Sequence, residues 1–289
     1  MKVTFPALKG TQSGLTFYTV MSSYNDLNKN FIFDDHDLPI ELRQQRALNE
    51  GRAAAFANYI KENPETYVTG AVVGTIDDRV KFIPLESPFV SNDSVGLLQF
   101  DSDMKICLVD GQHRQRGIGS AVDENPNIGS EELPIVLYTA DSIKRKQQIF
   151  ADQNGNTVKP SSSLNITFDH RSKFNAFIKE LIDEMPSIKA KIDYEASSIG
   201  ALSSKFWPLV SFKKFICNLT GMNEKTFVKE VSDDETAERI KEIIKSVISG
   251  FDSLPMWSDA INGNITASEV RKSHIVAHAV FLEALGVWA

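Results

Sequence analysis

The sequence predicts an α/β domain of the α+β type, followed by an α-helical domain. Runs rich in β-branched and aromatic residues occur only in the first half, whereas helical periodicity continues to the end of the chain. The 289 residues, of which 42% are hydrophobic, are enough to form two cores. Because the strand-like runs cease near Asn165, we expect the domains to cover residues 1–165 and 166–289.

Local patterns give the elements of the first domain. Ala53, Ala57 and Ile60 recur at helical spacing before Pro64, which predicts an amphipathic helix. Short β-rich runs separated by turn-forming residues predict strands. After an apolar segment near residues 15–22, the expected elements are, in order, a helix at 47–63, strands at 67–76, 80–85, 95–100 and 105–109, a helix from residue 110, a strand at 133–139 and a helix at 142–154.

The second domain shows no comparable strand pattern. Its main helices are expected over residues 170–185, 234–251 and 267–286. His274 and His278 lie four residues apart in the last of these, a spacing that can bind zinc. Since the sequence offers neither a third ligand nor an HExxH glutamate, we expect packing or hydrogen-bonded histidines and no metal site.

Composition and charge exclude several classes of protein. Cys107 and Cys217 are far apart and form no CxxC pair, which argues against a disulfide framework and a structural zinc site. No apolar run reaches the length of a membrane span and no signal-peptide pattern opens the chain, so a cytoplasmic protein without a membrane partner is expected. The net charge of -7 argues against nonspecific coating of nucleic acid but leaves a local basic face open.

The stretch CLVDGQHRQRGIGSAV, residues 107–122, holds the candidate binding site. A strand that stops at an Asp-Gly turn and continues as a helix leaves backbone N–H groups at the helix start, and these groups favour an anion. Asp110 is expected to cap this helix, and Gly111 to allow a tight turn and close approach of a ligand. His113 and Arg114 fall in the first turn, where cations oppose the helix dipole unless an anion is present. The alternative is an ordinary capped turn.

The segment VDGQHRQRGI resembles the signature of the DGQHR-domain proteins, among them the DndB family associated with bacterial DNA phosphorothioate modification, and more distantly the ParB/sulfiredoxin-like fold. Residues 42–60 and 68–76 are similar to the family's opening helix and strand, and residues 149–172 to its stretch after the second helix. The similarity is strongest from Leu38 to Arg171 and looser over the helical remainder. It implies a ParB/sulfiredoxin-like mixed sheet in the first domain.

The resemblance implies that Gly111, Gln112, His113 and Arg114 surround the phosphates of a nucleotide, ATP or another nucleoside triphosphate. Arg114 would supply a planar charged fork, and His113 a donor without a fixed charge. Asp110 and His113 are the candidates that orient water if the nucleotide is hydrolysed, with Mg2+ as the accompanying ion. Sulfiredoxins have a nucleophilic cysteine where Gln112 stands, so reduction of sulfinic acids is excluded.

Two further groups complete the candidate site. Gln153 and Asn154 offer amides where the family brings a polar segment near its nucleotide, although an Asn-Gly turn at a helix end gives the same pattern. Arg43, Arg46 and Arg52 surround the start of the first helix and are candidate contacts to DNA or another anion. Solvated arginines are the alternative explanation for their spacing.

The resemblance implies a DndB-like DNA-binding regulator of transcription, or an accessory protein, in a DNA sulfur (phosphorothioate) modification system. It would bind ATP, with slow hydrolysis at the turn, and its partners would be DNA and other proteins of that system. The alternative is a kinase-like, nucleotide-dependent enzyme acting on a small molecule, since a similar fold with an Asp-Gly-His-His-Arg turn occurs in free-serine kinases. The sequence contains no P-loop and no HNH-like or acidic nuclease motif. It leaves the oligomeric state open.

Overall fold

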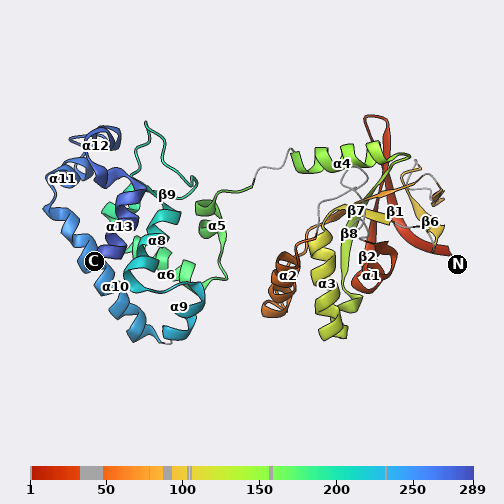
Figure 1. Ribbon diagram of the computed structural model, residues 1–289, viewed down its shortest axis with the longest axis horizontal. Helices are drawn as coiled ribbons and strands as arrows, with labels where there is room; N and C mark the ends of the chain where they lie inside the picture. The colour runs from red at the N-terminus through yellow and green to blue at the C-terminus, as the bar shows by residue number, and fades with distance from the viewer. Residues whose placement is uncertain are drawn as a thin grey trace. The chain divides into compact units, whose positions relative to one another are not determined.

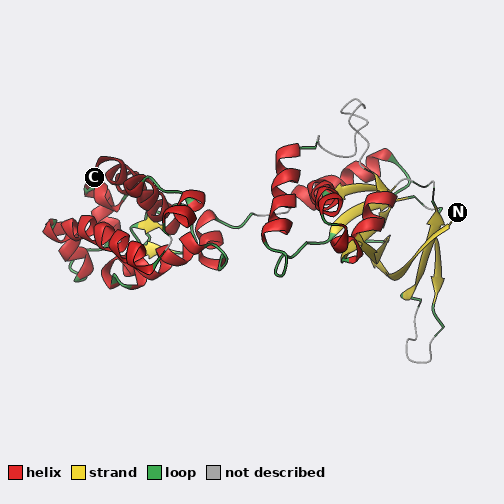
Figure 2. Cartoon of the chain, turned by 90° about the horizontal axis from the view of Figure 1, so that it is seen from below, coloured by secondary structure: helices red, strands yellow, loops and turns green. Residues whose placement is uncertain are grey.

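The chain divides into two units, Met1–Thr157 and Val158–Ala289 (Figure 1). The computed structural model describes residues 2–32, 48–77, 79–86, 93–102, 104, 106–155, 159–231 and 233–289. The predicted fold class is confirmed, because strands form the centre of the first unit and helices dominate the second (Figure 2). Asn165, where we expected the domain boundary, lies inside helix α5 (Ser162–Phe168), which belongs to the second unit.

Unit 1 is built on a mixed sheet. Its described strands are β1 (Lys2–Gln12), β2 (Leu15–Ser23), β3 (Phe31–Ile32), β4 (Val72–Ile76), β5 (Lys81–Pro84), β6 (Val95–Asp101), β7 (Ile106–Asp110) and β8 (Glu132–Thr139). They lie in the order β3-β7-β4-β8-β2-β1-β6-β5. The β3–β7 and β4–β8 pairs are parallel, whereas β4 and β7 pair antiparallel. Strand β7, which leads into the candidate site, therefore lies second from one edge of the sheet, between β3 and β4.

Helices cover both faces of this sheet. Those described in unit 1 are α1 (Tyr24–Asn30), α2 (Glu50–Glu62), α3 (Gln112–Glu124) and α4 (Ile143–Gly155), with a 3-10 turn, η2 (Pro126–Ser130). Because side chains alternate along a strand, Ile135 and Leu137 of β8 join a core with α1, α2 and α3. Tyr138 instead joins a smaller cluster with Val109 of β7 and Ile149 of α4. The end of β7 thus lies between helices of the two faces.

Helices α2 and α3 approach each other closely at Gly117. A Cβ atom added to Gly117 would lie 2.7 Å from the Ala53 carbonyl oxygen and 3.0 Å from the Phe56 Cβ. Only a residue without a side chain fits such a backbone contact. The close approach fixes the position of α2, and hence of its first turn, relative to α3.

We expect Gly117→Ala to lower the stability of unit 1 by about 1–3 kcal/mol, the usual cost of overpacking, because the added methyl group meets backbone atoms. Gly119→Ala is the matched control, since the atoms nearest to its added Cβ belong to the Asn28 side chain, with Oδ1 at 3.2 Å, and not to the backbone. Urea unfolding followed by far-UV circular dichroism measures the difference. Tryptophan fluorescence should not change, because all three tryptophans lie in unit 2. Equal stability of the two variants would contradict the packing argument.

Unit 2 is helical and surrounds one core. Its described elements are α5, α6 (Lys173–Asp183), α7 (Pro186–Lys191), α8 (Leu209–Thr220), α9 (Glu224–Glu230), α10 (Asp234–Ser249), η3 (Gly250–Ser253), α11 (Pro255–Ile261), α12 (Ala267–Ser273), η4 (Ile275–Ala277) and α13 (Ala279–Trp288), with short strands β9 (Ile192–Asp193) and β10 (Trp207–Pro208). Trp207 and Trp257 stack in the core with ring centroids 5.7 Å apart. Among the described residues, no helix combines the length and apolar character that a membrane crossing needs.

The prediction of a single helix over residues 267–286 is wrong. His274 and His278 both have extended backbone angles, and they separate α12, η4 and α13. The His278 Nε2 donates to the Arg271 carbonyl oxygen at 2.9 Å, and the His274 Nδ1 forms a hydrogen bond of 2.8 Å with the Ser273 hydroxyl. Both histidines are hydrogen-bonded, as predicted, but they do not share a helical face. Helical periodicity continued through the two breaks, which is why the sequence did not reveal them.

Candidate functional site

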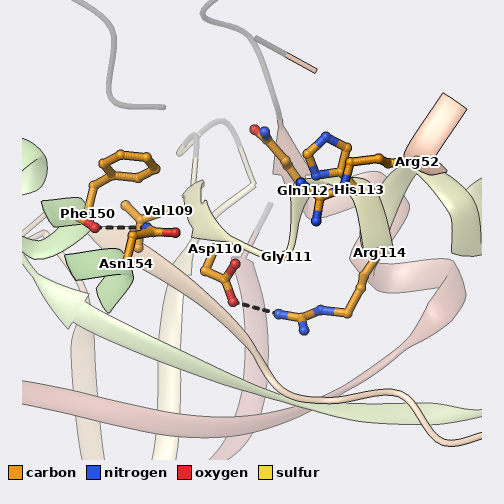
Figure 3. Close-up of a pocket in the computed structure, with 9 residues that line it drawn as sticks. All are labelled: Arg52, Val109, Asp110, Gly111, Gln112, His113, Arg114, Phe150 and Asn154. Carbon is orange, nitrogen blue, oxygen red and sulfur yellow. Dashed lines mark hydrogen bonds and ion pairs between the residues drawn. The ribbon is translucent and has the colours of Figure 1, made fainter. Parts of the chain in front are cut away.

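The turn between β7 and α3 lines a pocket in unit 1 (Figure 3). The described residues that line it are Arg52, Val109, Asp110, Gly111, Gln112, His113, Arg114, Phe150 and Asn154. The first turn of α2, the end of β7, the start of α3 and the second half of α4 therefore meet here. All five residues of the Asp-Gly-Gln-His-Arg turn are brought together, along with Arg52 and Asn154 from distant segments.

Gly111 shapes the pocket through its backbone. Its φ of 98° and ψ of 9° are left-handed, and an added Cβ would lie 2.4 Å from the Val72 Cγ1. Both the conformation and the close contact require glycine. Gly111 is also the N-cap residue of α3, and no side chain caps this helix. Since the intrahelical bonding begins with the Gln115 N–H, which donates to the Gly111 carbonyl oxygen at 2.9 Å, the N–H groups before it have no acceptor within the helix.

The expectation that Asp110 caps α3 is wrong. The N-cap is Gly111, one residue later, and the Asp110 carboxylate instead accepts from the Arg114 Nη2 at 2.7 Å. The same nitrogen donates to the Ala71 carbonyl oxygen at 2.9 Å. The left-handed turn at Gly111 directs the Asp110 side chain along the helix, four residues forward, and away from its first N–H groups. Asp110 and Arg114 therefore form an ion pair inside the pocket.

Arg114 is held by its ion pair with Asp110, and its side chain is half-buried. Its Nε is buried and has no hydrogen-bond partner among the described residues. The two opposite charges of Asp110 and Arg114 largely cancel within the pocket. The positive charge left on the described lining residues comes from Arg52.

His113 connects the first turns of two helices. Its Nε2 accepts a hydrogen bond from the Asn49 backbone N–H at 3.0 Å. Asn49 is the N-cap of α2, and its Oδ1 accepts from the Arg52 backbone N–H, also at 3.0 Å. An imidazole nitrogen that accepts is unprotonated, so the proton of the neutral ring is on Nδ1. While this bond is kept, Nε2 has no lone pair with which to take a proton from water.

Arg52 lies at the edge of the pocket on the first turn of α2. The residue is exposed, and its guanidinium has no partner in the part of the chain that the structure describes. The same first turn holds Glu50, whose Oε2 lies 3.8 Å from the Arg116 Nε, so the N-terminal end of α2 already carries a negative charge beside Arg52. Of the three arginines that we expected to contact DNA or another anion, Arg52 lines the pocket, whereas Arg43 and Arg46 lie outside the described residues.

Helix α4 forms the opposite wall. Asn154 lines the pocket, and its Nδ2 donates to the Phe150 carbonyl oxygen at 2.9 Å, which leaves its amide oxygen as an acceptor. Gln153 is on the same helix but does not line the pocket. Phe150 and Val109 supply an apolar surface that the sequence did not reveal, because both fit the pattern of ordinary core residues. No group of three or more His, Cys, Asp or Glu suited to a metal ion occurs among the described residues.

Comparison with known proteins gives a family for the whole chain. A family model, DndB, described as DNA-sulfur modification-associated, matches residues 5–289 and thus spans both units. No curated protein and no solved structure matches the chain significantly.

Proposed function

The chain belongs to the DndB family of DNA-sulfur modification-associated proteins, and from this premise we propose that it is a DNA-binding regulator or accessory protein whose pocket binds a nucleotide through its phosphates. Family membership gives it a role in a DNA sulfur modification system. The nucleotide we propose is ATP, and the partners are DNA and other proteins of the system.

One observation carries the nucleotide proposal: the glycine turn at Gly111 leaves the 13-residue helix α3 without a side-chain cap where it faces the pocket. N–H groups at a helix start, together with the helix dipole, form a site for phosphate oxygens. Arg52 adds a positive charge at the edge of the same pocket. The chemistry of these groups fits an anion and would not suit a cation.

The size of the pocket supports a phosphate group. The pocket has a volume of about 90 Å³ and is open to solvent, compared with roughly 300–1,000 Å³ for pockets that hold a whole ligand. The phosphates would occupy this space, and the rest of the nucleotide would extend outward. Asp110 is already paired with Arg114, so a Mg2+ ion would be held chiefly by the phosphates themselves.

The hydrogen bonds of His113 favour a switch over a fast ATPase. The Asp110 carboxylate is held in its ion pair with Arg114, and the His113 Nε2 already accepts from Asn49, so neither residue is well placed to act as a general base. Hydrolysis would rely on positioning and be slow. Nucleotide occupancy would instead alter the affinity for DNA, and such couplings are typically about 1–3 kcal/mol.

Phe150 is expected to contact the nucleotide base. Stacking of a base on an aromatic ring contributes about 1–3 kcal/mol. We expect Phe150→Leu to weaken binding of ATP but not of inorganic tripolyphosphate, which has no base. Phe82→Leu, at a partly buried ring that does not line the pocket, is the matched control. Calorimetry with both ligands measures this, and an equal loss for both would show that Phe150 only supports the fold.

A basic turn at the start of α4 supports DNA as a partner. Lys144 and Arg145 are exposed, the first turn of α4 has no acidic residue, and neither side chain has a carboxylate partner within the described residues. Cations at a helix start are suited to contact with backbone phosphates of DNA. The same helix carries Phe150 and Asn154 into the pocket, which offers a direct connection between nucleotide and DNA.

The salt dependence of DNA affinity tests this basic turn. Each phosphate contact contributes about 0.9 to the slope of log affinity against log salt. The double variant Lys144→Ala, Arg145→Ala should therefore reduce the slope by about 1.8. Lys225→Ala with Lys229→Ala, two exposed lysines of α9, is the charge-matched control. An unchanged slope in the α4 variant would remove this turn from the DNA interface.

DNA affinity with and without ATP at fixed salt tests the proposed function as a whole. We expect DNA binding that weakens steeply as salt rises and that changes about five- to 150-fold when ATP is added. An affinity ratio of one would refute the coupling. ATP binding without DNA binding under any condition would instead favour the alternative, a nucleotide-dependent enzyme acting on a small molecule.

A further inference from the structure

The strongest unassigned feature is the connection between His113 and Arg52. The Asn49 backbone N–H donates to the His113 Nε2 at 3.0 Å, and the Asn49 Oδ1 accepts from the Arg52 N–H at 3.0 Å. His113 and Asn49 are 64 residues apart in the sequence. The first turn of α2, which carries Arg52 to the pocket, is thereby fastened to the first turn of α3.

The charges of Arg114 and Arg52 differ in how far they are compensated within the protein. Arg114 donates to Asp110 and to the Ala71 carbonyl oxygen, so most of its charge is compensated inside the protein. The Arg52 guanidinium has no such partner among the described residues and is exposed at the edge of the pocket. An arginine fork forms strong, charge-assisted hydrogen bonds to phosphate oxygens.

We propose that Arg52 is the cation that contacts the phosphate, and that His113 is a positioning residue which holds Arg52 in place through Asn49. This inference rests on the proposed nucleotide binding and names the residues that set its affinity. It differs from the sequence-based expectation, in which Arg114 supplied the fork and His113 oriented water. Backbone N–H groups of α3 and the Arg52 guanidinium then approach the phosphate from two helices whose spacing is fixed at Gly117.

Calorimetric titration of the full chain with inorganic tripolyphosphate and with ATP tests the role of Arg52. Arg52→Ala should weaken both ligands at least tenfold, and Arg52→Lys, which keeps the charge but loses the fork, should fall between it and the wild type. Arg79→Ala is the control, because Arg79 is an arginine of unit 1 that pairs with Asp77 and does not line the pocket. Equal binding by Arg52→Ala and the wild type would overturn the assignment.

A double-mutant cycle tests the positioning role of His113. His113→Ala should weaken binding in the wild-type background but have no further effect when Arg52→Ala is present. His113→Gln should restore most of the affinity, since its amide oxygen can accept from the Asn49 N–H although an amide cannot act as a base. Thermal unfolding of each variant shows whether it is folded.

Each result of the cycle has one meaning. If the losses caused by His113→Ala and Arg52→Ala are additive, His113 acts independently of Arg52, as it would by contacting the phosphate itself. The positioning role would also be overturned if a folded His113→Gln variant bound no better than His113→Ala. If the wild type binds neither ATP nor tripolyphosphate at millimolar concentration, the proposed function fails and this inference fails with it. If the wild type binds and Arg52→Ala binds equally, only the inference fails.

Discussion

Gly111→Ala is expected to abolish nucleotide binding and to lower the stability of unit 1 by roughly 2–5 kcal/mol. Two costs combine: a left-handed backbone, with φ at 98°, strains a residue that has a Cβ, and the new methyl group would lie 2.4 Å from the Val72 Cγ1. If the backbone shifts to relieve the strain or the contact with Val72, the N–H groups at the start of α3 move with it. Calorimetry with ATP and urea unfolding measure the two effects.

Two variants separate strain from collision at Gly111. Gly14→Ala introduces a methyl group at a φ of 77° where no atom lies within 4 Å, so it reports the cost of backbone strain alone. In a Val72→Ala background, Gly111→Ala should cost less stability than in the wild type, because the closest colliding atom, the Val72 Cγ1, is gone, while the Val72 Cβ at 2.9 Å remains. Wild-type nucleotide affinity in Gly111→Ala would show that the glycine turn does not form the binding site.

Arg114→Ala is expected to weaken ATP binding by about 1.5–3 kcal/mol, which is roughly tenfold to more than a hundredfold. The physical reason is the Asp110 carboxylate, which is 2.7 Å from Arg114 and would otherwise remain as an uncompensated negative charge beside the phosphates. Adding Asp110→Asn to Arg114→Ala removes that charge. The double variant should therefore recover most of the lost affinity.

The double variant also distinguishes two roles for Arg114. Recovery of affinity indicates that Arg114 acts by neutralising Asp110, as the geometry favours. A double variant that binds as weakly as Arg114→Ala would mean that the Arg114 fork itself contacts the phosphate. Circular dichroism controls for folding, because the Arg114 side chain also holds the Ala71 carbonyl group.

Local patterns predicted the elements around the site well. The helix at 47–63, the strand before Asp110 and the helix after it match α2, β7 and α3, because each depends on short-range periodicity and turn chemistry. Strand β1 was missed, since Pro6 and a polar end concealed its alternation of buried Phe5 and Ala7. Likewise, β4 begins only at Val72, later than the run from Tyr67 had suggested.

The contacts within the site were less accessible from the sequence. The hydrogen bond between His113 and Asn49 joins segments 64 residues apart, and no local pattern in either segment predicts it. Asp110 before a glycine is a common capping pattern, so its pairing with Arg114 depended on the backbone angles of Gly111. Phe150 had the periodicity of a core residue, and only the position of α4 brings it to the pocket.

A crystal structure of the protein with a non-hydrolysable ATP analogue is the most direct test of phosphate binding at this turn. We predict phosphate oxygens within hydrogen-bond distance of backbone N–H groups in the first turn of α3, with the Arg52 guanidinium in contact with them and the base beside Phe150. A nucleotide bound at another site, with no phosphate at the start of α3, would contradict the account.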